Sequence, residues 1–184
     1  QGSAVGSLSF KDISFTFLFE TSQGGDIFSG TKSVLTDFGR WGSTANEITS
    51  SQNLVKFNGE IIEAGNTFRG DIYNFGAGPV AVTQEWYNGP GGFFGGNSEL
   101  FVEDGSWTRL REVSISYNLN NKWTKSIGVD NVSVSATGRN LLLWTAFEGN
   151  DPDTNVSGVS ASRGIDYFNN PSTKSYVFSL SVTF

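Results

Sequence analysis

The chain has 184 residues, a formal net charge of −6, and neither cysteine nor histidine. Without cysteine it can form no disulfide and no thiolate metal site, and without histidine it lacks the commonest general base and metal ligand. An acidic chain without clustered Lys and Arg is a poor partner for nucleic acid, whose phosphates require basic side chains. Sixteen Phe, five Trp and five Tyr favour strands, and twenty-three Gly favour turns, so the composition predicts an all-β fold.

Residues 7–20 are the first expected strand. Its apolar side chains alternate with others along the chain: Ile13, Phe15, Phe17 and Phe19. Leu8 and Phe10 are out of phase with this series, and we expect a β-bulge at Lys11-Asp12 to reconcile the two halves. An aromatic face of this kind fits contact with lipid, whereas in a soluble sandwich it would be core.

The alternation disappears over residues 21–99, which we expect to be a long loop rich in glycine. Within it, Asn58-Gly59 lies between two apolar pairs and predicts a small β-hairpin at 54–63. Four aromatic residues are set among the loop glycines: Trp86, Tyr87, Phe93 and Phe94. They are candidates for a binding surface, or they pack on their own loop.

Residues 100–119 and 132–144 are expected to form an antiparallel hairpin across a short connection, 120–131. If Leu119 lies opposite Val132, apolar residues match along one face, and Glu112 meets Arg139 on the other. The same register sets Trp107 opposite Trp144.

That register also places Arg109 and Arg111 on the apolar face above Val113. Two explanations are open: the strands extend beyond the lipid at this end, or a bulge switches the phase. We favour the first.

Residues 145–173 form a second expected loop, and residues 174–184 are the last strand. One face of this strand is wholly apolar: Tyr176, Phe178, Leu180, Val182 and Phe184. A strand of about 9–11 residues is what a tilted crossing of a bilayer requires. Long and short connections alternate as in outer-membrane barrels, whose smallest members have about eight strands, so four strands cannot close one. We expect the partner of the last strand to lie outside these 184 residues.

Several of these segments resemble the SusC/RagA family of TonB-dependent transporters. Phe101 to Leu119 is similar to the family's segment before its penultimate hairpin turn. Gly138-Arg-Asn-Leu-Leu-Leu-Trp-Thr145 and Gly149-Asn-Asp-Pro-Asp-Thr-Asn155 look like its Asn-Leu and Asp-Pro-Glu signature, with Asp153 in place of Glu. Pro171 to Phe184 is similar to its closing strand, and Phe10 to Phe19 fits more loosely. Residues 31–99 match no motif of the family.

The resemblance implies that the chain is the C-terminal portion of a 22-stranded transmembrane β-barrel in the outer membrane of a Bacteroidota-type bacterium. The strands 7–20, 100–119, 132–144 and 174–184 would be wall strands, 21–99 and 145–173 external loops, and 120–131 a periplasmic turn. The family implies a plug and the rest of the barrel, a SusD-like lipoprotein lid, TonB, and an oligosaccharide or peptide substrate. The chain would then be a transporter segment and not an enzyme.

The resemblance also suggests roles for individual residues. Trp107, Trp123 and Trp144 lie near strand ends, where a membrane interface enriches tryptophan, although ordinary cross-strand packing would place them there too. Glu112 and Arg139 would face the lumen as a structural pair. Trp86, Tyr87, Phe93 and Phe94 would contact a ligand or the lid. The last strand would close the barrel, and with Phe184 at its end it resembles the signal read by the outer-membrane assembly machinery.

Two other hypotheses concern chemistry. Asp151, Asp153 and Asn155 have the alternating spacing of a calcium loop, but Val156 and Ser162 stand where glycine and glutamate belong, so we expect an Asp-Pro turn and no cofactor. The carboxylates Glu99, Glu103, Asp104 and Glu112 suit a charged strand end better than a glycosidase pair. The alternative to transport is a soluble secreted β-sandwich that binds a ligand or mediates adhesion.

Overall fold

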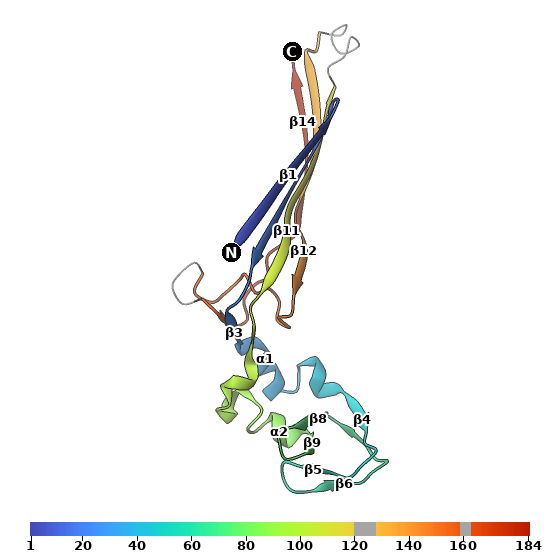
Figure 1. Cartoon of the computed structure of the whole chain (residues 1–184), viewed down its shortest axis with the longest axis vertical. Coiled ribbons are helices and arrows are strands. Elements are labelled where there is room, and N and C mark those ends of the chain that lie inside the picture. Colours follow the sequence, from blue (N-terminus) through green and yellow to red (C-terminus); the bar gives the residue numbers. More distant parts are fainter. Residues whose placement is uncertain (120–127, 159–162) are drawn as a thin grey trace. The chain divides into compact units, whose positions relative to one another are not determined.

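The computed structural model describes residues 1–119, 128–158 and 163–184 (Figure 1). The chain divides into two compact units. The wall unit contains Gln1–Asp26, Asp104–Thr154 and Asn170–Phe184, and the loop unit contains Ile27–Glu103 and Asn155–Asn169. Among the described residues, no helix is both long enough and apolar enough to span a membrane.

The wall unit is one antiparallel sheet of five strands in sequence order (Figure 1). Its strands are β1 (Gly2–Phe10), β2 (Ile13–Ser22), β11 (Trp107–Leu119), β12 (Asn131–Thr145) and β14 (Ser175–Thr183). Each strand pairs with the next along the chain, so β1 and β14 are the two edges. Connections alternate between short ones at one end of the sheet and long ones at the other.

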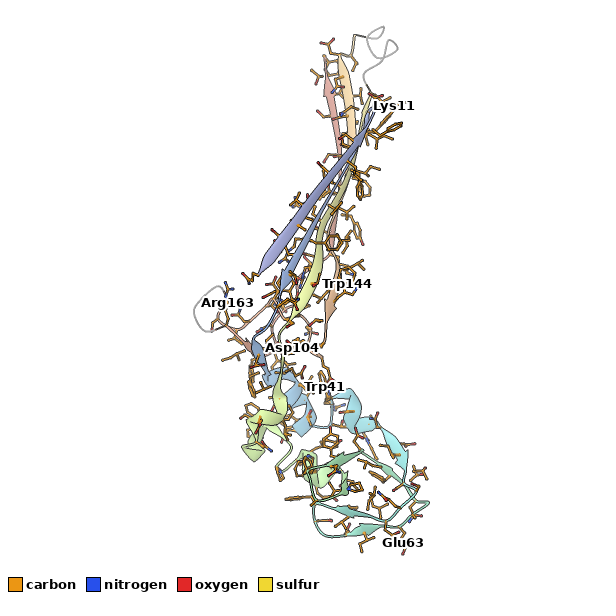
Figure 2. All side chains as sticks on the ribbon, in the orientation of Figure 1. Lys11, Trp41, Glu63, Asp104, Trp144 and Arg163 are labelled. Carbon is orange, nitrogen blue, oxygen red and sulfur yellow. The ribbon has the colours of Figure 1, made fainter. Side chains whose placement is uncertain are left out.

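One face of this sheet is apolar across all five strands. In one cross-strand row Leu8, Phe15, Ile115, Ala136 and Phe178 lie side by side. The side chains project from a single layer (Figure 2), and of the described residues in the five strands only Trp107 and Arg109 are buried. The large side chains that would fill a core in water are therefore exposed or only half-buried.

Residues 7–20 form a hairpin and not one bulged strand, so the predicted bulge at Lys11-Asp12 is wrong. Phe10 pairs with Ile13 across a two-residue turn whose first residue, Lys11, has φ 53°. Two-residue hairpin turns require a positive φ at this position. The turn also explains the change of phase, because the chain reverses there. Figure 2 shows Lys11 at this end of the sheet, and the wall has five strands instead of four.

The β11–β12 pairing follows the expected register from Leu119↔Val132 to Glu112↔Arg139 and then shifts. Between Leu110 and Glu112, Arg111 is an extra residue relative to β2. The bulge moves Arg109 to the face of Glu112, opposite the apolar one. A bulge that switches the phase, and not an extension of the strands past the lipid, therefore explains the position of the arginines. The shift also pairs Trp107 with Thr145 instead of the expected Trp144.

The loop unit is folded where the sequence predicted a long loop. It contains three small sheets, ordered β10-β3-β13, β4-β7 and β6-β5-β9-β8. Their strands are β3 (Asp26–Ser29), β4 (Glu47–Thr49), β5 (Leu54–Lys56), β6 (Ile61–Ile62), β7 (Thr67–Arg69), β8 (Asp71–Asn74), β9 (Pro79–Val82), β10 (Val102–Asp104) and β13 (Ile165–Asp166). Its helices are α1 (Gly30–Asp37), α2 (Gln84–Tyr87) and the 3-10 turns η1 (Gly42–Ala45), η2 (Phe93–Gly95) and η3 (Ser98–Phe101).

A small apolar core holds the loop unit together. Leu54, Ile62 and Ala81 are buried, and Phe68 and Ile72 pack against them. The predicted hairpin is present: β5 pairs with β6, and Lys56 N donates to Glu60 O at 2.8 Å across the Asn58-Gly59 turn. The unit therefore buries apolar side chains as a small water-soluble domain does.

Candidate functional site

The bulge in β11 and β12 places two arginines at the end of the sheet where the long connections start. Asn140 takes φ 52° at this point, a left-handed conformation that asparagine tolerates better than most residues. Its Nδ2 donates to Thr173 O at 3.0 Å and its Oδ1 accepts from Arg111 at 3.2 Å. The bulge thus joins strand β12 to the chain just before β14.

Arg109 forms a buried ion pair with Asp151. Both side chains are only 3% exposed, and Ser172 completes the group by accepting from Arg109 and donating to the second oxygen of Asp151. Asp151 also accepts from the backbone N–H of Asp153 at 3.0 Å and of Ser172 at 3.2 Å. The carboxylate therefore has its hydrogen bonds satisfied, which a buried charge requires.

Arg111 pairs with two carboxylates at the same end of the sheet. Its Nε donates to Glu20 on β2, and its Nη2 donates to Asp153 at 2.8 Å. The guanidinium carbons of Arg109 and Arg111 lie 5.5 and 5.6 Å from the ring centroid of Trp107, within cation–π range. We call Glu20, Trp107, Arg109, Arg111, Asn140, Asp151, Asp153 and Ser172 the ionic cluster.

The ionic cluster fixes both ends of the connection between β12 and β14. Asp151 and Asp153 lie near its start and Ser172 lies near its end. Although burial opposes ionisation of Asp151, hydrogen bonds from Ser172 and Arg109 hold its pKa below the usual value. The carboxylate is therefore charged at neutral pH, and the arrangement is suited to holding a long loop at a defined place on the sheet.

Two curated proteins of Formosa agariphila are similar to this chain. TonB-dependent receptor P3 is 32% identical over 89 residues, 46% of this chain. TonB-dependent receptor P26 is 26% identical over 184 residues, 97% of this chain. The chain is therefore similar in sequence to TonB-dependent receptors. It spans 9% of the length of P3 and 16% of P26, so it corresponds to a small part of such a receptor. No protein-family model matches it.

Solved structures of RagAB have a fold similar to that of this chain. The RagAB peptide importer in its closed-closed state gives a TM-score of 0.61, and the open-open state gives 0.57. Both comparisons have 17% sequence identity and cover 100% of this chain and 17% of the other. The expected all-β antiparallel fold is confirmed, and the expected resemblance to TonB-dependent receptors agrees with the two relatives. Within the described residues the sheet does not close on itself.

The two aspartates of the calcium hypothesis are already paired with arginine side chains. Asp151 is bound by Arg109 and Asp153 by Arg111, while Asn155 Oδ1 accepts from Ser157 N at 3.1 Å. Over the described ranges, no three His, Cys, Asp or Glu side chains are grouped to hold a metal ion. The hydrogen bond from Asp153 N to Asp151 fits the predicted Asp-Pro turn.

The three tryptophans proposed for a membrane interface have different surroundings. Trp107 is 7% exposed and lies within the ionic cluster, so its ring is not free to face lipid. Trp144 is 49% exposed, stacks on Phe19, and is labelled on β12 in Figure 2. Trp123 lies outside the described residues. The interface position remains a prediction for Trp144.

The other two groups predicted for the wall are the pair of Glu112 with Arg139 and the apolar residues of the last strand. Arg139 Nε donates to Glu112 at 2.9 Å, although the pair is largely exposed and its place in a lumen stays a prediction. The apolar side chains of β14 are exposed at the edge of the sheet, from 40% for Val182 to 80% for Phe178, and Phe184, just after the strand, is 85% exposed. Their role in closure and assembly also stays a prediction.

The four aromatic residues of the loop unit do not form one surface. Trp86 joins Phe57 and Phe75 in one cluster, with ring centroids 5.7 and 4.8 Å away. Phe93 and Phe94 join Tyr167 and Phe168 in another. Tyr87 is buried, so it belongs to neither. Contact of these aromatics with a ligand or lid remains a prediction.

Sequence reasoning missed the ionic cluster, although a signal for it was present. Arg109 and Arg111 are two residues apart on a strand, and Asp151 and Asp153 are two residues apart in the following loop. Two pairs of equal spacing and opposite charge can meet as a double ion pair. The sequence could suggest this match, but it could not show that Ser172 and Glu20 complete it.

Proposed function

We propose that this receptor segment takes part in the import of oligosaccharides or peptides across the outer membrane, with energy supplied through TonB. The observation that carries the proposal is the single-layer sheet, apolar on one face across five strands, which fits a barrel wall in lipid. The relatives are TonB-dependent receptors, and RagAB is a peptide importer, which supports import without deciding between the two substrates.

The wall strands would lie in the membrane and the loop unit on its external side. β14 presents an unpaired edge with large apolar side chains, which invites aggregation in water. Its partner would be the first strand of the rest of the barrel, which also encloses the plug. The ionic cluster would hold the external connections in place, and a SusD-like lipoprotein would cover them.

The soluble β-sandwich alternative has less support. A sandwich buries one face of each sheet against the other at about 10 Å. In the described part of the wall unit there is one sheet, and no second sheet covers its apolar face, whose side chains are exposed or half-buried.

Membrane extraction tests the proposal. The protein should remain in outer membranes after an alkaline carbonate wash and should be released by detergent together with a much larger β-barrel. Producing cells should take up labelled oligosaccharides or peptides, and uptake should stop when TonB is deleted. A monodisperse monomer of about 20 kDa without detergent, or uptake that is unchanged without TonB, would contradict the proposal.

Deletion of Phe184 tests the assembly role of the last strand. We expect the deletion to lower insertion into the outer membrane, measured as surface level and heat-modifiable migration, because the exposed aromatic residue that directly follows β14 is lost. Phe184→Tyr, which keeps an aromatic ring, is the matched control. Normal insertion of the deletion variant would count against the role.

A further inference from the structure

The apolar face of the wall sheet has a hollow of about 270 Å³ along β12. In two neighbouring cross-strand rows of this face β12 contributes only an alanine and a glycine, Ala136 and Gly138. Residues two positions apart on a strand lie on the same face, so these two small residues form one continuous floor. The residues beside them are larger: Ile115 and Val113 on β11, and Phe178 and Tyr176 on β14.

The hollow is a trough that one side chain closes at one end. A Cβ at Gly138 would lie 2.9 Å from Cδ2 of Leu141, so the leucine lies against the glycine on the side of the long connections. In the other direction Val134 and Val132 follow on this face of β12, and neither carries a ring. We call this hollow the β12 trough.

The β12 trough has the shape and polarity for an unbranched hydrocarbon chain. The three strands pair along it, so their backbone N–H and C=O groups are used within the sheet. A ligand with many hydrogen-bonding groups would leave them unpaired there, at a cost in free energy. Neighbouring strands lie about 4.8 Å apart, so β11 and β14 are roughly 10 Å apart. With side chains on both walls, this width accepts one chain and excludes a flat ring system.

Packing distinguishes the β12 trough from the rest of the apolar face. Lipid tails are as apolar as the side chains they touch, so van der Waals contacts decide which surfaces retain a tail within the membrane. A flat wall touches a tail on one side, whereas the trough touches it on the floor and on both walls. Phe178 and Tyr176, which are 80% and 67% exposed, would gain such contacts. Both walls belong to this sheet, so a further strand beside β14 would leave the trough open.

The position of the β12 trough along the strand selects one leaflet. Val132 pairs with Leu119 at the end of the sheet with short connections, and Gly138 lies six residues further along β12. Six residues rise about 20 Å, and a strand tilt of 35–45° reduces this to roughly 15 Å of depth. The apolar band of a barrel is about 25 Å tall, so the trough reaches the middle of the membrane from that end. With short connections on the periplasmic side, this leaflet is the phospholipid leaflet of an outer membrane.

We propose that the β12 trough is a lipid site that holds one acyl chain of a phospholipid from the periplasmic leaflet. The methyl end of the chain lies against Leu141, and the chain lies over Ala136 and Gly138. The site rests on the proposed function in one respect, namely that the apolar face lies in the membrane. A chain held on three sides should stay with the protein when detergent removes the lipid around it.

Filling the β12 trough with a ring tests the proposal. Native mass spectrometry of the detergent-solubilised receptor, in the full form that its host makes, should show one retained phospholipid per receptor. In Ala136→Phe the ratio of lipid-bound to lipid-free receptor should fall about tenfold, the effect of roughly ten lost atom contacts. Ala136→Leu, which adds less volume, should lower the ratio by a smaller factor.

Val134→Phe is the matched control. Val134 lies on the same strand and the same face but outside the lining of the trough, so the new ring should leave the ratio unchanged. Heat-modifiable migration shows that each variant is folded, and Ala136→Leu decides in place of Ala136→Phe if the larger side chain prevents folding. No retained lipid in wild type, equal retention in the folded Ala136 variants, an equal loss in Val134→Phe, or retained lipopolysaccharide instead of phospholipid would overturn the proposal.

The lipid site and the import function can fail separately. Mass spectrometry in detergent requires neither TonB nor transport. A membrane-embedded protein that retains phospholipid through the β12 trough but does not import would disprove the import function and leave the site standing. A protein that imports through TonB and shows equal lipid retention with Phe at position 136 would do the opposite.

Discussion

The two units of the chain differ in the side chains that they bury. The wall unit exposes large apolar residues, such as Phe178 at 80%, and buries Arg109 and Asp151. The loop unit buries Leu54, Ile62 and Ala81 and leaves most of its charges exposed. In water the burial of apolar surface drives folding, so the loop unit has the kind of apolar core that folds in water. The wall unit has the arrangement expected where lipid covers one face and charges are sheltered on the other.

Loss of the buried pair of Arg109 with Asp151 should cause the largest decrease in the free energy of unfolding. Arg109→Ala would leave Asp151 buried and unpaired, at a cost of about 3–5 kcal/mol in the free energy of unfolding. Arg139→Ala removes an exposed pair and should cost about 0–1 kcal/mol. Urea unfolding of detergent-folded protein measures both. Equal losses would show that burial of the first pair has no energetic consequence.

Truncation of the loop-unit core should be nearly as damaging but confined to that unit. Leu54 is fully buried, and Leu54→Ala should cost about 2–5 kcal/mol through lost contacts and the cavity left behind. Hydrogen exchange should then rise over residues 27–103 and stay unchanged in the wall strands. Ile61→Ala, at a 62% exposed position, is the control. A matching rise in the wall would refute separate stability of the two units.

Substitution of the bulge residue Asn140 should lower the stability of the wall unit by a smaller amount. Two substitutions separate the loss of its hydrogen bonds from backbone strain. Asn140→Gly removes its two side-chain hydrogen bonds but tolerates φ 52°, whereas Asn140→Ala adds left-handed strain of about 1–2 kcal/mol. We therefore expect Ala to destabilise the wall unit more than Gly in the same urea titration. The reverse order would mean that the backbone at this position is not held in the left-handed region.

Acid should weaken the ionic cluster only at low pH. The pKa of Asp151 in the folded protein lies below its ordinary value of 3.8, so its charge contributes stability above that pH. This contribution is lost as the pH falls through the folded pKa. Acid unfolding of wild type should therefore be steeper below 3.8 than that of Asp151→Asn, which starts less stable and does not titrate there. Parallel curves would contradict the lowered pKa.

The wall strands β11, β12 and β14 could be predicted from the sequence because their signal is local. Alternating apolar residues identify a strand and its apolar face, and the matching of Leu119 with Val132 carries the register to Glu112 and Arg139. The Asn58-Gly59 hairpin is equally local. The folded state of residues 27–103 could not be predicted. Its strands are too short to show a clear alternation of apolar and polar residues, and several pair with strands far away in the sequence.

The sequence by itself determined that this protein is an antiparallel β structure with one apolar face. Only the tertiary structure decided that the chain reverses at Lys11 and that β11 bulges at Arg111. Each of these features involves only one or two residues, yet it changes the face of the sheet to which the following side chains point. Whether it forms depends on the strands that pair there, and these come from other parts of the chain. The pairing of Arg109 with Asp151 follows from the bulge, because it moves the arginine to the face where a carboxylate 42 residues away can reach it.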